Sequence, residues 1–115
     1  MALTEFGKAI RKARLDANET ISTMADSLGV SAAFLSGVET GRKKIPSTLV
    51  PAITSFFSGK GVAVHDLDLL ADVSNKSVSL EGLGPMQQML LAGFARRNLD
   101  EATLKNLAAL LGSAP

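Results

Sequence analysis

Residues 20–43 read TISTMADSLGVSAAFLSGVETGRK, and this stretch decides the fold. Two short helices are predicted in it, over 20–29 and 32–40, because apolar side chains recur at helical spacing in each. Gly29 is expected to end the first helix, since glycine takes a left-handed conformation at little steric cost. Ser31 then caps the second helix. With one residue between that glycine and the next cap, the chain must turn a tight corner between the two helices.

Four groups of residues in and around this corner lie at a defined spacing from one another. They are Met24-Ala25, Leu28-Gly29-Val30-Ser31, Leu35-Ser36 and Val38-Glu39-Thr40-Gly41-Arg42. With these groups the chain resembles the Xre, or lambda-repressor-like, family of helix-turn-helix regulators over roughly residues 6 to 73. The resemblance implies an all-α fold with a five-helix DNA-binding domain, here residues 1–74, and the function of a sequence-specific transcriptional regulator.

Three further helices are predicted in this domain, over residues 4–18, 48–57 and 64–73. Thr4 is a suitable cap for the first of them. Their apolar faces and those of the two corner helices are expected to share one core. The predicted core comprises Phe6, Ile10, Ala13, Ala17, Met24, Ala25, Leu28, Leu35, Val38, Leu49, Ile53, Phe56, Phe57, Leu67, Leu70 and Ala71.

The pattern changes after residue 74. Residues 75–80 alternate polar and apolar side chains, which predicts a short strand or a plain extended linker. A strand here would need a partner, and the simplest one is the same strand of a second copy. Two amphipathic helices, from Pro85 to about residue 97 and from an Asp100 cap to residue 111, are expected to form a helical hairpin. Residues 75–115 are therefore predicted to be an extension that dimerises or binds another protein.

The helix over 32–40 is expected to reach base edges in the major groove of double-stranded DNA with its first residues. By the family resemblance, the base-edge positions are Ala32, Ala33, Phe34, Ser36 and Gly37. Alanine cannot form bidentate hydrogen bonds to bases, although it can pack on thymine methyl groups, as Phe34 can. Specificity should then depend on methyl contacts and DNA shape. The alternative for Phe34 is a place in the core.

Contacts with DNA phosphates are expected from hydroxyl and cationic side chains at the two helix starts and in the loop after residue 41. These are Thr20, Ser22, Thr23, Ser31, Arg42, Lys43 and Lys44. Residues 1–60 contain eight basic and five acidic side chains, a net charge of +3, whereas residues 61–115 have a net charge of −2. The basic half is where a DNA-binding unit should lie.

Glu39 is interpreted as a structural residue. In the family that the chain resembles, a glutamate at this position pairs with an arginine of the first helix or hydrogen-bonds the following loop. Arg11 and Arg14 are the candidate partners in this sequence.

Composition excludes several other classes. The chain has no cysteine, and therefore no disulfide or cysteine-ligated metal, and no apolar run reaches the roughly 18 residues that span a bilayer. The amino-terminal sequence MALTEFGKAIRK has no signal-peptide core, so a cytoplasmic protein is expected. The lone His65 stands beside Asp66 and Asp68 and is interpreted as a surface or capping residue. No enzymatic activity, cofactor or metal is predicted.

Three functions fit the sequence. The first is a homodimeric repressor that binds an inverted repeat with half-sites ~34 Å apart. The second is the antitoxin of a toxin–antitoxin module, which would also hold a toxin protein. The third is a protein-interaction adaptor that does not bind DNA, a function favoured by the alanines at 32 and 33.

Overall fold

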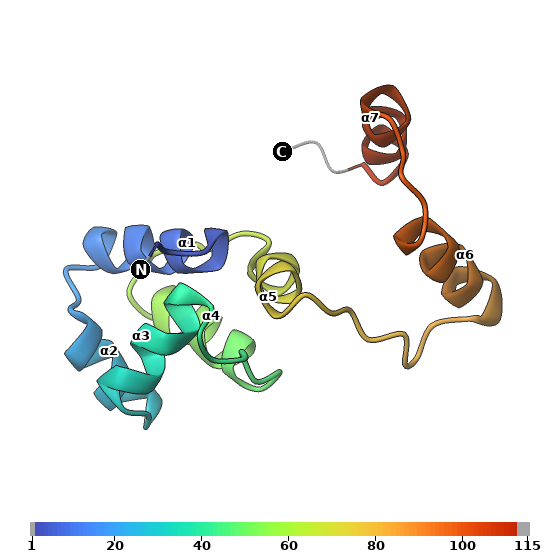
Figure 1. The fold of residues 1–115 in the computed structure, drawn as a ribbon. Helices are drawn as coiled ribbons and strands as arrows, with labels where there is room; N and C mark the ends of the chain where they lie inside the picture. Colours follow the sequence, from blue (N-terminus) through green and yellow to red (C-terminus); the bar gives the residue numbers. More distant parts are fainter. Residues whose placement is uncertain (1, 113–115) are drawn as a thin grey trace. The chain divides into compact units, whose positions relative to one another are not determined.

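The computed structural model describes residues 2–112, which are all-α, with seven helices and no strand (Figure 1). The chain divides into two compact units, one up to Val78 and the other from Ser79 onward. The helices of the first unit are α1 (Glu5–Asp16), α2 (Ile21–Leu28), α3 (Ala32–Thr40), α4 (Leu49–Ser58) and α5 (Leu67–Asn75). Those of the second are α6 (Pro85–Ala95) and α7 (Glu101–Leu110).

The predicted strand over residues 75–80 is wrong. Asn75 is the last residue of α5, and Lys76 follows it in a left-handed conformation with φ 56°. The backbone N–H of Lys76 donates to the Val73 carbonyl (3.2 Å) and that of Ser77 to the Asp72 carbonyl (3.1 Å). These bonds close the helix in the manner of a left-handed C-cap. The beginning of the predicted strand thus completes α5, and no strand is available within residues 2–112 to pair with the remainder.

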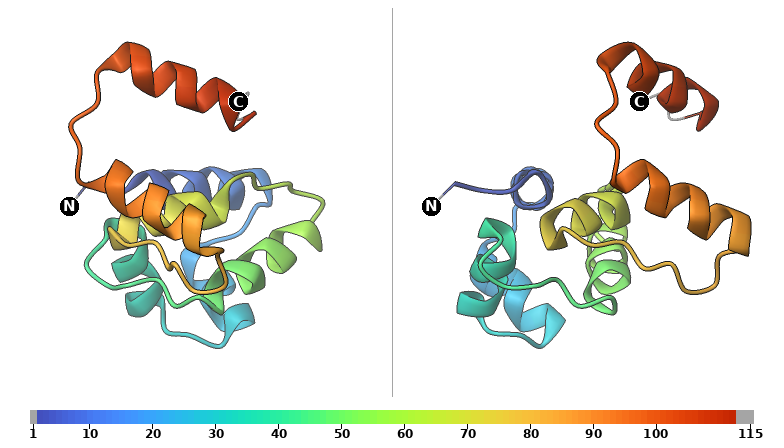
Figure 2. Two further views of the ribbon diagram at one scale, coloured as in Figure 1. Left: turned by 90° about the vertical axis from the view of Figure 1, so that its right-hand side faces the viewer. Right: turned by 45° about the vertical axis from the view of Figure 1, so that its right-hand side comes forward.

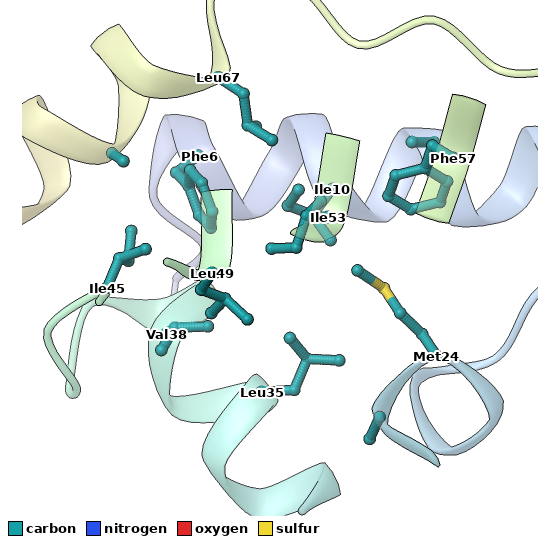
Figure 3. Close-up of a cluster of buried hydrophobic side chains, with 13 residues drawn as sticks. Phe6, Ile10, Met24, Leu35, Val38, Ile45, Leu49, Ile53, Phe57 and Leu67 are labelled. Carbon is teal, nitrogen blue, oxygen red and sulfur yellow. The ribbon is translucent and has the colours of Figure 1, made fainter. Parts of the chain in front are cut away.

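The first five helices, seen from further directions in the ribbons of Figure 2, enclose one hydrophobic core, whose side chains Figure 3 shows in close-up. The helical spacing of apolar residues predicted most of it. Its buried members are Phe6, Ile10, Ala13, Met24, Ala25, Leu35, Val38, Ile45, Leu49, Ile53, Phe57, Leu67 and Ala71. Four further predicted positions, Ala17, Leu28, Phe56 and Leu70, are partly buried against it. Ile45 was not predicted, because it lies in the basic loop after α3 and not on a helix.

The amino-terminal turn of α1 packs tightly against the end of α3. A Cβ atom on Gly7 would overlap the carbonyl oxygen of Glu39, so only glycine allows this approach. The backbone N–H of Thr4 donates to the same carbonyl at 3.0 Å, and its hydroxyl caps α1 by accepting from the Gly7 N–H at 3.0 Å. The carboxyl-terminal end of α3 is therefore fixed on α1.

The second unit contains both predicted helices but no core. Asp100 caps α7 by accepting from the Thr103 N–H at 2.8 Å, as predicted, and α6 begins at Pro85. Neither helix buries a residue; Leu91 of α6 is half-buried, and Met86, Met89, Leu90 and Phe94 are exposed. The packed hairpin predicted from their apolar faces is therefore not confirmed.

Candidate nucleic-acid interface

The helix caps that were predicted from the sequence form the corner between α2 and α3. Gly29 ends α2 with φ 72°, and the N–H of Val30 donates back to the Ala25 carbonyl at 3.0 Å. The Ser31 hydroxyl then accepts from the Phe34 N–H at 3.0 Å and starts α3. The helix axes turn through 107°. That angle is within the ~90–120° of helix-turn-helix units.

The amino-terminal end of α3 is open to solvent. Ser31 and Ala33 are exposed, while Ala32, Phe34 and Ser36 are half-buried. Phe34 is partly buried against the edge of the core, as one of its two interpretations expected, and the rest of its surface is accessible. The opposite face of α3 contributes the fully buried Leu35. Four of the five predicted base-edge positions therefore have surface that a ligand can reach.

Gly37 is the fifth position, and it is buried. A Cβ atom here would lie 2.6 Å from Cγ of Lys43, and the Lys43 N–H donates to the Gly37 carbonyl at 3.1 Å. Absence of a side chain at Gly37 thus lets the Lys43 stem lie across α3. Gly37 acts by seating a cation of the basic loop, and little of its own surface is available to a base.

Glu39 lies near the carboxyl-terminal end of α3 and is buried, with 3% of its surface accessible. Its carboxylate forms an ion pair with the Arg14 guanidinium. Arg14 is one of the two arginines that were predicted as its partner. Burial raises the pKa of Glu39, while the hydrogen bond from Arg14 and the charges of Arg14 and Arg11 oppose this rise. This pair ties α3 to α1.

The start of α2 is occupied by its own side chains. Thr20 and Thr23 form a reciprocal capping box, with the Thr23 N–H donating to the Thr20 hydroxyl at 3.1 Å. The Thr23 hydroxyl also donates to the Glu19 carboxylate at 2.7 Å. This bond and the nearby Lys60 ammonium, 3.2 Å from Glu19, lower the pKa of Glu19, which remains ionised. A carboxylate at this helix start disfavours a phosphate there, whereas Ser22 is exposed.

The basic loop after α3 projects three exposed cations. Neither Arg42 nor Lys43 takes part in any ion pair recorded for residues 2–112. Lys44 donates to the Asn75 carbonyl at 2.6 Å, so one of its donors is used internally. The Asn75 side chain accepts from the Ile45 N–H at 2.8 Å and donates to the Ile45 carbonyl at 3.0 Å. This pair of bonds holds the base of the loop.

Sequence reasoning missed both Glu19 and Asn75. Glu19 precedes the Thr20 cap. An acidic residue at this position could have indicated that a carboxylate already neutralises the positive start of α2. Asn75 carries no local signal of its contact with Ile45, which lies 30 positions away.

No family model, curated protein or solved structure matches the chain at a significant level. No single helix within residues 2–112 is long and apolar enough to cross a membrane. The fold class and this geometry are therefore the basis for assigning a function.

Proposed function

We propose that the protein is a sequence-specific DNA-binding transcriptional regulator. Acting as a homodimeric repressor, it inserts α3 of each subunit into the major groove of one half-site of an inverted repeat. The observation that carries this proposal is the solvent-open amino-terminal end of α3 at a 107° corner with α2, backed by a buried ion pair. A helix presented in this way has the shape that a major groove admits.

Base contacts in this proposal are few and mostly apolar. The exposed methyl group of Ala33 and the accessible part of Phe34 can pack on thymine methyl groups. The Ser36 hydroxyl is the one hydrogen-bonding side chain among the candidate positions on α3. The proposed specificity therefore combines thymine contacts with sequence-dependent DNA shape.

The proposed phosphate contacts lie at the amino terminus of α3 and in the basic loop that follows α3. Ser31 stands at the amino terminus of α3, where the helix dipole favours an anion. Arg42 and Lys43, free of internal ion pairs in the described part of the chain, supply charge from the basic loop. Because Thr20 and Thr23 bond one another beside Glu19, they contribute less than Ser22.

Selection of bound DNA from a random pool tests the proposal. The expected product is an inverted repeat, rich in A·T pairs, with half-site centres ~10 base pairs apart or a multiple of one helical turn. The affinity for that product should fall steeply and linearly on a log–log plot against salt concentration. Failure to enrich any sequence, together with no measurable affinity for duplex DNA at 50 mM salt, would favour the adaptor function.

A further inference from the structure

An open groove runs between the outer side of α4 and the segment that leads into α5. It consists of two adjoining hollows, of about 450 and 370 Å³, which share Thr54 and Val64 among their lining residues. The residues that α4 contributes are small or apolar, namely Val50, Pro51, Thr54, Ser55 and Ser58. Because α4 contains no charged residue, this side of the groove is neutral throughout.

The opposite side of the groove is a short extended segment, residues 62–65, which lies outside any helix or turn. Its side chains alternate, with Val62 and Val64 half-buried and Ala63 and His65 exposed. A period of two is typical of an extended chain, whose successive side chains point to opposite sides. No hydrogen bond recorded for residues 2–112 includes a backbone group of the last three of these residues. The segment therefore resembles an edge strand, which presents a row of backbone donors and acceptors.

Two carboxylates stand at the α5 end of this groove. Asp66 and Asp68 both line it, and both are exposed. Asp68 accepts from the Leu69 N–H at 2.9 Å, but no ion pair recorded for residues 2–112 contains either carboxylate. No cationic side chain of the described residues lines the groove. The local potential is therefore negative, which favours a cationic group at this end and disfavours a phosphate.

We propose that this groove, formed by the outer side of α4 and residues 61–68, binds an extended peptide segment of another protein. The backbone of the peptide pairs with residues 63–65, and its alternate apolar side chains enter the groove. A lysine or arginine of the peptide lies opposite Asp66 and Asp68. This interaction goes beyond the proposed function, because none of the groove residues is among those proposed to contact DNA.

The shape and charge of the groove favour a peptide over other ligands. Small molecules bind in concave sites that enclose most of their surface, whereas this groove is open along its length. Duplex DNA would bring phosphates against the two carboxylates. A helix would cover the apolar side chains of α4 but has no backbone groups to offer residues 63–65. An extended chain alone satisfies both sides of the groove.

A short synthetic peptide with blocked ends is the probe, in the order lysine, threonine, valine, threonine, valine, threonine, lysine. This symmetric order brings a lysine to the carboxylates whichever way the peptide runs. Titration into the isotope-labelled full chain, followed by NMR, should shift the amide signals of residues 62–66 and of α4. A dissociation constant of about 0.1–1 mM is expected, because an open groove and a short edge bury little surface. Signals that stay unmoved at peptide concentrations well above this range would overturn the proposal.

Thr54→Arg tests the position of the peptide. Thr54 lines both hollows, so a long side chain there crosses the middle of the groove and should weaken binding at least about tenfold. Ala52→Arg is the matched control, since Ala52 is exposed on the same helix, does not line the groove and receives the same charge. It should bind the peptide as the wild type does. Equal losses in the two variants would trace the effect to charge alone and contradict the proposed position.

The double variant Asp66→Asn/Asp68→Asn tests the cationic position. It should weaken binding of the lysine peptide about fivefold, as expected for two exposed ion pairs. Asparagine keeps the shape of the side chain and tolerates the left-handed backbone of Asp66, with φ 55°. Asp26→Asn, at an exposed carboxylate of α2, is the control and should have no effect. Equal affinity of the double variant and the wild type would overturn the chemistry assigned to the partner.

Backbone pairing is tested with two N-methylated forms of the same peptide. Along a strand, alternate residues direct their N–H groups to one neighbour, so methylation of one alternate set removes the pairing and methylation of the other does not. Of a form methylated at the valine nitrogens and a form methylated at the threonine nitrogens, one should lose binding and the other should retain it. Retention by both forms, or loss by both, would refute pairing with residues 63–65.

Dilution of the wild-type chain without peptide identifies a different occupant. The amide signals of residues 62–66 should not move with protein concentration. Shifts at these residues that depend on concentration and disappear in Thr54→Arg would assign the groove to a second copy of the chain and overturn the proposal.

Discussion

The ion pair between Arg14 and Glu39 decides how α3 is held. Both partners are largely shielded from water, with 12% and 4% of their side-chain surfaces accessible. Taking a carboxylate out of water costs several kcal/mol unless a cation and hydrogen bonds compensate. Arg14 supplies that compensation at the end of α3 opposite to the one that faces DNA in the proposed complex. Orientation of the exposed end therefore depends on this buried contact.

Arg14→Ala is expected to lower the free energy of unfolding by about 3 kcal/mol at pH 7, because it leaves the Glu39 carboxylate buried without its cation. Burial already raises the pKa of Glu39, and loss of Arg14 removes the strongest opposing group. The folded variant then takes up a proton at higher pH than the unfolded chain does. Its deficit relative to wild type should shrink as the pH falls from 7 towards 4. Urea titrations at several pH values measure this, and a deficit independent of pH would contradict it.

The matched control is Arg11→Ala, since Arg11 is exposed and acts on Glu39 only through its charge. It should change the free energy of unfolding by less than about 0.5 kcal/mol. Comparable losses in the two variants would mean that the direct pair with Arg14 is not the stabilising element.

Ala33→Glu is expected to separate DNA binding from stability. The position is exposed in the first turn of α3, where a carboxylate interacts favourably with the helix dipole, so thermal stability should be unchanged or slightly raised. In the proposed complex the same carboxylate meets the negative potential of the groove, and affinity for selected DNA should fall at least about tenfold. Lys43→Ala should instead weaken binding to all sequences and lower the salt slope by about one. Fluorescence anisotropy measures both, and unaltered affinity of the Ala33 variant would place α3 outside the groove.

At the scale of the element, the basic loop owes its position to the end of α5. The Asn75 side chain both accepts from and donates to the backbone of Ile45, whose own side chain is buried in the core. Lys44 adds a third bond to the Asn75 carbonyl. The end of α5, 30 positions further along the chain than Ile45, thus positions the cations that follow α3.

Asn75→Ala is expected to remove two hydrogen bonds and lower the free energy of unfolding by about 2 kcal/mol. The loop should also become more mobile, with faster amide hydrogen exchange at Ile45 and its neighbours. Ser77→Ala, an exposed change two residues later, is the control and should alter neither quantity. Protection at Ile45 that equals the wild type in the Asn75 variant would refute the role assigned to this side chain.

At the scale of the whole molecule, the buried apolar residues are distributed unequally between the two units. Every residue of the hydrophobic core lies before residue 72, while Met86, Met89 and Leu90 of α6 are between 66% and 78% accessible. Helices that bury nothing gain little stability from packing and depend on weak intrinsic propensity. The second unit is therefore expected to be the less stable one.

A fragment comprising residues 1–78 is expected to fold cooperatively, with a melting temperature within a few degrees of the full chain. The reason is that its core contains no residue from the second unit. Differential scanning calorimetry of both proteins measures the difference. An unfolded fragment would mean that α6 or α7 contributes to the stability of the first unit.

The sequence by itself determined which helix faces are apolar and where six of the seven helices described in residues 2–112 begin; α5 begins at Leu67 and not at the predicted residue 64. Thr4, Ser31 and Asp100 were predicted as caps, and each accepts the expected backbone N–H. Gly29 was predicted as a helix end, and it has a positive φ. These signals are legible because a cap or a terminal glycine acts within four residues, so its cause and its effect lie in the same short stretch of chain.

Only the tertiary structure decided which groups meet across the fold. Arg14 and not Arg11 pairs with Glu39 across 25 positions, and Asn75 completes α5 and bonds Ile45 across 30 where a strand was expected. The burial of Gly37 under Lys43 likewise depends on how the loop folds back on α3. Helical spacing allows several partners for each such side chain, and the packing of α1, α3 and α5 around one core selects among them.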